Sequence, residues 1–489
     1  MSVEKSIPFT GSGAAAGLKG GALNLDDVQK GSPPGRPLGR MATAMGLQRE
    51  LGLFSLTNIV VANMIGAGVL TLAGFLLTEL RNPLVMMVLW FIGGVGALCG
   101  AVCYGRLGAA FPMAGGEYVY LSRLFHPLAG FLSGWISFFV GFSAPIAAAA
   151  LAIIEYATRA FPSILGPDVL PGSATALFLK KFYAILIIIL CTMVHCRGVR
   201  LGARVQNGLT FIKIAGIVLF VVAGFAFGRG NLGHLLQGRG LNLDFAQCKS
   251  IGLSFLWIMF AYSGWNASAY IGSEARSPRR NLPRSLILGT AAVMILYLAL
   301  NLLYVFAIPA GEMSRTTTIG GLAAAKLFGR SLDRVFSIFI ALALFSSLSA
   351  YVMLGPRVYF SMARDGLFFR FAAKVHPRTK VPSRSILFQG AIAAAMVLIG
   401  SFEQLLTYLG FALGIFPILA VVGVFKLKRQ EKLAGAPGGT PLAAVFFIVT
   451  SILMLVLSLL ERPTESLIAI ATLLLGIPLY FFVFRGERK

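Results

Sequence analysis

Residues 62–70 read Ala-Asn-Met-Ile-Gly-Ala-Gly-Val-Leu, in the middle of an apolar run from Leu51 to Thr78. That run is long enough to cross a bilayer, which takes about 20 residues. Its centre holds two glycines, each of which costs a helix about 1 kcal/mol relative to alanine. A broken span survives in lipid only where it lines a cavity or packs inside protein. The stretch therefore predicts a binding site at a broken helix, with a glycine-lined packing face as the alternative.

The composition is that of a helical membrane protein. Of 489 residues, 57% are hydrophobic and 12% are charged, and the mean hydropathy is +0.82. The formal net charge of +24 does not indicate nucleic-acid binding, because the basic residues lie in loops between apolar segments. The five cysteines suggest no disulfide framework. The four histidines lie far apart in the sequence, so we expect neither a metal site nor a cofactor.

Apolar segments long enough to form transmembrane helices recur along the chain. Twelve can be marked, at 51–78, 84–105, 127–155, 181–197, 206–227, 251–274, 285–308, 332–362, 385–401, 404–425, 442–460 and 466–484. Residues 1–50 precede them and are expected to form a disordered cytoplasmic tail. Lys and Arg are more frequent in the loops on the side of the N-terminus. This bias predicts a multi-pass protein of the cytoplasmic membrane with both termini in the cytoplasm.

The two halves of the chain repeat. The break at Gly66 is matched by Ser263-Gly264 in the sixth segment, and segments three to five recur as segments eight to ten. Five is an odd number, so the second copy must run the opposite way across the membrane. We expect a first five-helix repeat over 51–230, an inverted repeat over 251–425, and two further helices over 442–485. Paired broken helices in such a repeat mark a binding site at the midplane.

The two breaks offer complementary chemistry. A half-helix that starts at the first break presents free N–H groups and a positive dipole end, which suit a carboxylate. Carbonyl groups freed at the second break can accept hydrogen bonds from an ammonium group. Together they would hold an α-amino acid at both ends, with Phe260 closing over its side chain and Trp265 packed behind. Since no carboxylate lies near either break in the sequence, neutral substrates are favoured.

The sixth segment also resembles that of a known family. Residues 260–266, Phe-Ala-Tyr-Ser-Gly-Trp-Asn, with Gly-Ser-Glu at 272–274 and Asn-Leu-Pro-Arg at 281–284, are similar to the sixth helix of amino acid permeases of the APC superfamily. The L-type amino acid transporters and their bacterial relatives are the nearest group. Residues 64–68 resemble the first-helix motif of the family, and 112–118 and 355–366 resemble two cytoplasmic-side signatures. The resemblance implies an all-α LeuT-type fold, a five-plus-five inverted repeat with broken helices 1 and 6.

The resemblance also implies substrate-binding roles for matching residues. The substrate carboxylate would meet Ile65, Gly66, Ala67 and Gly68; the amino group would meet backbone carbonyls of Phe260, Ala261 and Ser263; and Asn266 would be a polar residue near the site. In this family the place of Ala67 is held by serine. Because alanine has no hydroxyl, the backbone N–H groups would carry the carboxylate contact here.

Lys213 lies within the predicted fifth helix. A lysine there costs about 2.5–3.5 kcal/mol on insertion scales, so it is a functional candidate, although it could also reach the inner surface with its long side chain. The L-type family carries a lysine at this place, where sodium binds in sodium-coupled relatives. The resemblance implies that Lys213 links the broken first helix to the eighth helix, through Ser346 or Ser347. The sequence does not decide whether transport occurs by exchange or by proton symport. Arg357, in the eighth segment, is expected to reach the inner surface.

These features predict a secondary active transporter rather than an enzyme. We expect sodium-independent exchange of neutral L-amino acids across the membrane by alternating access. A proton-coupled permease for cationic amino acids or polyamines is the first alternative, and a non-transporting amino acid sensor is the second. The partners expected are the amino acid and the lipid bilayer, with no nucleic acid. The loop between the third and fourth helices lacks cysteine, so no disulfide-linked partner subunit is expected.

Overall fold

The computed structural model describes residues 47–166, 170, 172–238, 240, 244–313, 319–329, 332–399, 402–429, 440–461 and 463–484. Most of the predicted N-terminal tail, residues 1–46, therefore lies outside the described residues. Every regular element in the described part of the chain is a helix, and β pairing there is confined to two isolated bridges. The predicted all-α class is confirmed.

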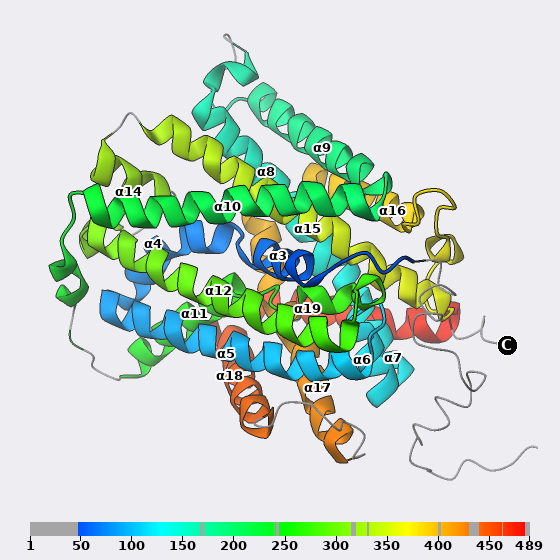
Figure 1. Ribbon diagram of the computed structural model, residues 1–489. Coiled ribbons are helices and arrows are strands. Elements are labelled where there is room, and N and C mark those ends of the chain that lie inside the picture. The colour runs from blue at the N-terminus through cyan, green and yellow to red at the C-terminus, as the bar shows by residue number, and fades with distance from the viewer. Residues whose placement is uncertain are drawn as a thin grey trace, which may run out of the picture. The chain divides into compact units, whose positions relative to one another are not determined.

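Figure 1 shows the helices, which follow one another along the chain. In the first half they are α3 (Leu53–Met64), α4 (Ala67–Leu80), α5 (Pro83–Ala110), α6 (Glu117–Leu124), α7 (Pro127–Ile136), α8 (Ala144–Ala160), α9 (Ala174–Cys196) and α10 (Val199–Phe227). In the second half they are α11 (Phe245–Ala261), α12 (Pro278–Ala307), α13 (Ala310–Met313), α14 (Ile319–Phe328), α15 (Asp333–Arg364), α16 (Ser383–Ile399), α17 (Phe402–Arg429), α18 (Thr440–Glu461) and α19 (Pro463–Leu479).

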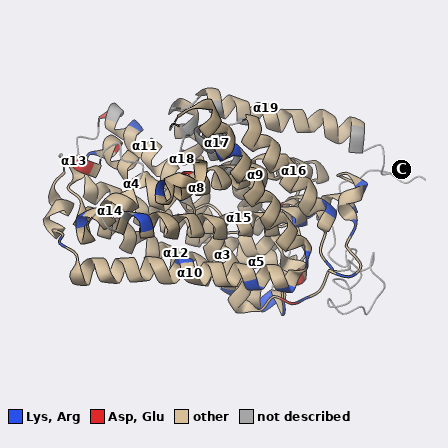
Figure 2. Ribbon diagram, turned by 90° about the horizontal axis from the view of Figure 1, so that it is seen from above, with Lys and Arg blue, Asp and Glu red and all other residues tan. Residues whose placement is uncertain are grey.

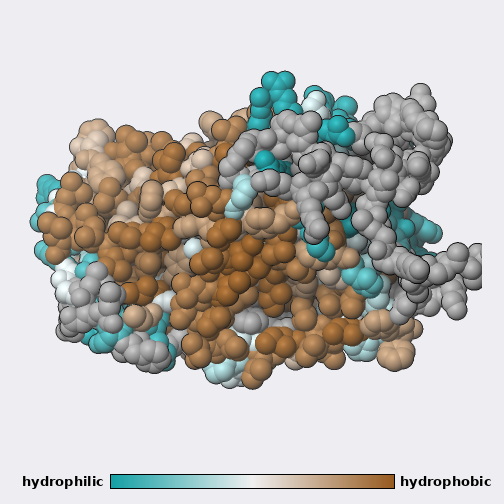
Figure 3. All heavy atoms as spheres, turned by 90° about the horizontal axis from the view of Figure 1, so that it is seen from below, coloured by the Kyte–Doolittle hydropathy of each residue, from teal (hydrophilic) through white to brown (hydrophobic). Residues whose placement is uncertain are grey.

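Many of these helices are suited to a membrane. Seven helical stretches in the described part of the chain are long and apolar enough to cross one, and six shorter helices are also apolar. Large apolar side chains on the outer surface of α9 and α10, such as Phe178 and Phe211, are about two-thirds exposed at 68% and 67%. Figure 3 shows a face covered mainly by hydrophobic residues, and Figure 2 shows few charged residues along the middle of the helices. Apolar surface of this extent indicates contact with lipid.

Several helices begin earlier than the apolar pattern predicts, and α9 and α10 are examples. α9 starts at Ala174 rather than 181, and α10 starts at Val199 rather than 206. The polar residues taken as loop lie in the helices, where their long side chains find partners. Lys180 pairs with Glu155 at 2.8 Å, and Lys181 Nζ donates to a backbone carbonyl of α16 at 2.7 Å. The helices are therefore longer than their apolar cores.

The helix predicted at 51–78 is interrupted where the glycines predict. α3 ends at Met64, the backbone of Gly66 is extended, and α4 starts at Ala67. Figure 1 shows α10 and α12 alongside α3, and both helices contact it. The peptide groups at the interruption are therefore enclosed by other helices rather than open to lipid, as a broken span requires.

The segment predicted as one helix over 251–274 is broken as well. α11 ends at Ala261, and short 3₁₀ turns follow at Ala267–Tyr270 and Gly272–Glu274. The break lies where the sequence predicts it, at Ser263-Gly264, and the chain continues in 3₁₀ turns rather than in a second α-helix. Gly264 causes the break, because its φ of 93° is a left-handed conformation that other residues rarely adopt. A Cβ at this position would also lie 2.5 Å from Asn63 Nδ2.

A buried ion pair fixes the end of this segment to α15. Arg357 Nε and a terminal nitrogen donate to the two carboxylate oxygens of Glu274 at 2.8 and 3.1 Å. The other terminal nitrogen of Arg357 donates to the Met353 carbonyl at 2.6 Å. Both charged residues are at most 1% exposed. The expectation that Arg357 reaches the inner surface was wrong, because a bidentate carboxylate partner is available inside the protein.

The Glu274–Arg357 pair should contribute to the free energy of unfolding, and variants of either residue test this. Glu274→Gln or Arg357→Met alone leaves one buried charge without its partner, which costs about 3–5 kcal/mol of unfolding free energy. Thermal and chemical unfolding of the purified protein in detergent would measure the loss. Glu155→Gln, which breaks an exposed pair, should cost at most about 1 kcal/mol. The double variant should lose less than the sum of the single losses, and additive losses would contradict the prediction.

Candidate functional site

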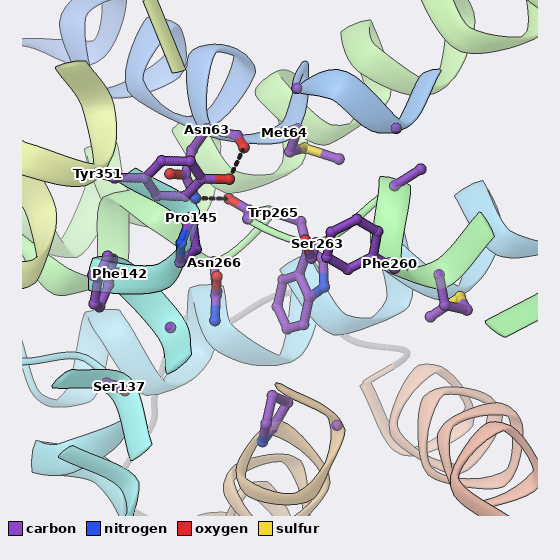
Figure 4. Close-up of a pocket in the computed structure, with 18 of the residues that line it drawn as sticks. Asn63, Met64, Ser137, Phe142, Pro145, Phe260, Ser263, Trp265, Asn266 and Tyr351 are labelled. Carbon is purple, nitrogen blue, oxygen red and sulfur yellow. Dashed lines mark hydrogen bonds between the residues drawn. The ribbon is translucent and has the colours of Figure 1, made fainter. Parts of the chain in front are cut away.

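A cavity lies between the two helix breaks (Figure 4). Its wall also includes residues of α8, α15, α17, α18 and the π-helical turn Ser137–Ser143 between α7 and α8. Seven of the predicted site residues line it: Gly66, Gly68, Phe260, Ala261, Ser263, Asn266 and Ser347. The two broken segments, far apart in sequence, therefore share one cavity. π-helical turns are frequent at functional sites.

The first break presents the N-terminus of α4. Gly66 precedes this 14-residue helix without a side-chain cap, and its own N–H donates to the Met64 carbonyl at 2.9 Å. The N–H groups of the first turn have no acceptor within the helix, so they and the helix dipole favour an anion. Gly68 allows the two broken segments to approach closely, since a Cβ there would lie 2.9 Å from that of Ala261.

The second break supplies carbonyl groups, of which one is free for a ligand among the described residues. The Phe260 carbonyl accepts from Ser263 N–H at 2.9 Å, and the Ala261 carbonyl accepts from the Tyr297 hydroxyl at 3.0 Å. No donor to the Ser263 carbonyl occurs in the described part of the chain. The Phe260 carbonyl also accepts from the Tyr262 N–H, whereas the Ala261 carbonyl keeps one lone pair. An ammonium group would therefore meet Ser263 most readily.

Hydrogen bonds tie the two breaks to each other. The Tyr297 hydroxyl on α12 is 2.6 Å from the Met64 carbonyl and 3.0 Å from that of Ala261. The dashed lines in Figure 4 mark weaker contacts of Asn63, whose Nδ2 is 3.5 Å from the Gly264 carbonyl and whose carbonyl is 3.4 Å from the Tyr351 hydroxyl. Tyr297 could not be identified from the sequence, because a tyrosine in an apolar helix has no distinguishing local signal.

Lys213 binds directly to the first break. Its Nζ is 2.7 Å from the Ile65 carbonyl, 3.2 Å from that of Ala62 and 2.8 Å from Ser347 Oγ. Ser347 Oγ in turn donates to the Ile65 carbonyl at 2.7 Å. Lys213 is 0% exposed, so it does not extend to the surface. An ammonium group has three protons, and each has an acceptor here.

Ser346 does not take part in this contact. Its Oγ lies 3.3 Å from Gln206 Nε2 and 3.3 Å from Thr210 Oγ1, both on α10. Consecutive residues of a helix point about 100° apart, so only one of the two serines can face Lys213. The structure brings Ser347 to Lys213, and it places Ser346 in a separate hydrogen-bonded group that joins α15 to α10.

A carboxylate also reaches the cavity, contrary to the expectation that none lies near a break. Glu117, at the start of α6, lines the cavity and is 5% exposed. Its Oε1 accepts from Asn266 Nδ2 at 2.7 Å, Tyr104 at 2.8 Å and Tyr270 at 3.2 Å. The expectation was wrong because Glu117 and Asn266 are 149 residues apart in the sequence.

In the described part of the chain, helices surround one cavity that two broken helices line, and this arrangement is typical of a membrane transporter. The profile of the family described as "Amino acid permease" matches residues 51–480, and the chain belongs to this family. The resemblance noted in the sequence is thereby confirmed, and so is the expectation of a transporter rather than an enzyme. The chain is a multi-pass membrane protein.

Named transporters are similar over most of their length. Asc-type amino acid transporter 1 of Mus musculus is 28% identical over 443 residues, 89% of this chain and 81% of the mouse protein. Large neutral amino acids transporter small subunit 2 of Homo sapiens is 27% identical over 482 residues, 96% and 88% of the two chains. The human b(0,+)-type amino acid transporter 1 is 27% identical over 450 residues, 89% and 88%. Because one of these names denotes a subunit, the comparisons give no support to our expectation that a partner subunit is absent.

The geometry of the second break can be tested at Gly264. Gly264→Ala would force a side chain into a left-handed conformation, at a strain of about 1–3 kcal/mol, and against Asn63. We expect the affinity for tritiated L-leucine or L-alanine to fall by about tenfold or more, as that strain displaces the Ser263 carbonyl. A scintillation proximity assay would measure binding. Gly208→Ala on α10 is the control, since nothing lies within 4 Å of its Cβ position. Equal affinities in the two variants would refute the assignment.

Proposed function

We propose that this chain is a secondary active transporter that moves amino acids across the cytoplasmic membrane by alternating access. Its activity would be sodium-independent exchange of neutral L-amino acids. The observation that carries the proposal is the contact of the Lys213 ammonium group with the broken first helix and Ser347 on α15. Membership of the amino acid permease family and the names of the relatives support amino acids as the substrate class.

The substrate would be recognised by its two charged ends. Its carboxylate would meet the first-turn N–H groups of α4, at residues Ile65, Gly66, Ala67 and Gly68. Its ammonium group would meet the carbonyls of Phe260, Ala261 and Ser263, with Asn266 nearby. Phe260 lines the cavity, and its ring would close over the side chain of the substrate. The remaining wall is mostly apolar or neutral, which favours neutral side chains.

Lys213 would take the place of a coupling cation. A sodium ion at the C-terminal end of α3 would need the carbonyl and hydroxyl oxygens that Lys213 and Ser347 already occupy. A fixed ammonium group there supplies positive charge without an ion that must enter and leave. This argument supports transport without sodium.

The full architecture we propose is a LeuT-type five-plus-five inverted repeat of twelve transmembrane helices, with helices 1 and 6 broken. The repeats would span 51–230 and 251–425, helices 11 and 12 would span 442–485, and residues 1–50 would form a cytoplasmic tail. Both termini would lie in the cytoplasm. Support comes from the two breaks, whose residues Asn63 and Gly264 are in contact although 201 positions apart.

A second candidate is a proton-coupled permease for cationic amino acids or polyamines. It is favoured by Glu117, the only charged side chain among the described residues that line the cavity. A carboxylate can bind a proton or a cationic group. A sensor that binds amino acids without moving them would share the same site.

Uptake into proteoliposomes tests the proposal. Radiolabelled L-leucine and L-alanine would be offered with and without internal amino acid, with and without sodium, and with and without an inward proton gradient. We expect uptake to need internal amino acid and not sodium. Lys213→Met should reduce uptake at least about tenfold, because three buried acceptors lose a charge-assisted donor worth about 1.5–3 kcal/mol.

Lys180→Met is the matched control, since this lysine pairs with Glu155 at an exposed site away from the cavity. Its uptake should equal that of the wild type. Specific binding without uptake under any condition would contradict the transporter and leave the sensor. Sodium-dependent uptake would contradict the role given to Lys213.

A further inference from the structure

A group of hydrogen bonds near Glu117 joins three segments that are distant in the sequence. Leu51 pairs through its backbone with residues 274 and 276, at 3.0 and 2.8 Å. In the loop between α5 and α6, Ala114 N–H donates to Ser273 Oγ at 2.8 Å and Gly115 N–H donates to the Tyr270 carbonyl at 3.0 Å. We refer to these links among residues 51, 114–115 and 270–276 as the clasp. The clasp joins the start of α3 and the α5–α6 loop to the segment after the second break.

Glu117 lies between the clasp and the cavity. It begins α6 directly after the clasp residue Gly115 and its neighbour, while its partners Asn266 and Tyr270 both line the cavity. All three hydrogen bonds to its side chain described here are accepted by Oε1. In the described part of the chain, no hydrogen bond or ion pair uses Oε2. The second oxygen is therefore available to a ligand from the cavity.

The groups that face Glu117 are neutral donors rather than cations. They are Tyr104 on α5, Tyr270 after the second break, and the amide of Asn266. The Tyr120 hydroxyl on α6 also lies near the carboxylate, and four charged or titratable groups of the neighbouring elements have other partners. Asp365 accepts from Tyr118, Arg357 pairs with Glu274, Lys426 lies over the Phe125 ring, and the ring nitrogen of His126 accepts from Leu128 N–H.

We propose that Glu117 is a proton-binding site of the transport cycle, loaded from the cavity at Oε2 and emptied when the clasp opens and water reaches the carboxylate. The proton moves from water on one side to Oε2, and from Oε2 to water on the other side, in the same direction as the substrate. The inference rests on the proposed transport function and adds a proton to its cycle.

Burial determines whether the closed or the open clasp binds the proton more tightly. Burial raises the pKa of the Glu117 carboxyl above its usual range, and the hydrogen bonds from Tyr104, Tyr270 and Asn266 offset part of that effect. A hydrated carboxylate has an ordinary pKa. The closed clasp therefore binds a proton more tightly than an open, hydrated one would. Opening the clasp therefore releases the proton to the side from which water enters, and a low proton activity on that side favours the release.

Lys213 is a poorer candidate for this proton. Each of its three protons has an acceptor, and Lys213 does not line the cavity. Loss of a proton would leave a buried carbonyl or hydroxyl oxygen of the first break without its donor. Glu117, by contrast, keeps its three donors in either protonation state.

The test compares uptake of radiolabelled L-alanine into preloaded proteoliposomes with and without an inward proton gradient. The gradient should stimulate the wild type by about threefold or more, since each pH unit changes proton activity tenfold. In Glu117→Gln the ratio of the two rates should fall to 1, and Glu117→Asp should restore part of the stimulation. Glu155→Gln, an exposed carboxylate variant, should keep the wild-type ratio.

Tyr270→Phe provides an independent outcome if Glu117→Gln does not fold. It removes one donor to the ionised carboxylate, so the midpoint of the proton stimulation should move to higher pH. Wild-type stimulation in Glu117→Gln, no stimulation of the wild type, or an unchanged midpoint in Tyr270→Phe would each overturn the inference. Absence of exchange at any pH would instead refute the proposed transport function itself.

Discussion

The structure depends on one constraint, which is that a helix broken within an apolar protein must find partners for its peptide groups. At the first break the Ile65 and Ala62 carbonyls accept from Lys213, and the Met64 carbonyl accepts from Tyr297. The N–H groups at the start of α4 have no acceptor within the helix. The break is therefore stabilised on its carbonyl side by the protein and stays unsatisfied on its N–H side, where an anionic ligand can bind.

The second break is held by the same set of contacts. The Tyr297 hydroxyl lies within hydrogen-bond distance of both the Met64 and the Ala261 carbonyls, and its one proton is shared between them, so it links the two broken segments. Gly68 and Gly264 then allow the segments to approach without side chains between them. Lys213, Ser347 and Tyr297 join this pair to α10, α15 and α12. A shift in the position of any of those helices would therefore alter the cavity. Alternating access needs such a connection between helix position and binding site.

Much of the site could be predicted from the sequence, because its signals are local. Glycines inside an apolar run predict breaks, and a lysine within a span predicts a functional contact. Ser347 could not be separated from Ser346 without the helix orientation. Glu117, Tyr297 and the Glu274–Arg357 pair were missed or misjudged because their roles come from contacts between distant segments. The inverted repeat, the topology and the substrate roles of individual residues stay predictions.

The central claim is that the two breaks bind opposite ends of one amino acid. Competition by modified substrates tests it most directly: L-alanine, its methyl ester and N-acetyl-L-alanine would each be offered against radiolabelled L-alanine in the exchange assay. The ester lacks the carboxylate and the acetyl derivative lacks the ammonium group. The account predicts that unlabelled L-alanine competes and that neither derivative does. Competition by either derivative as strong as that of L-alanine would contradict the account.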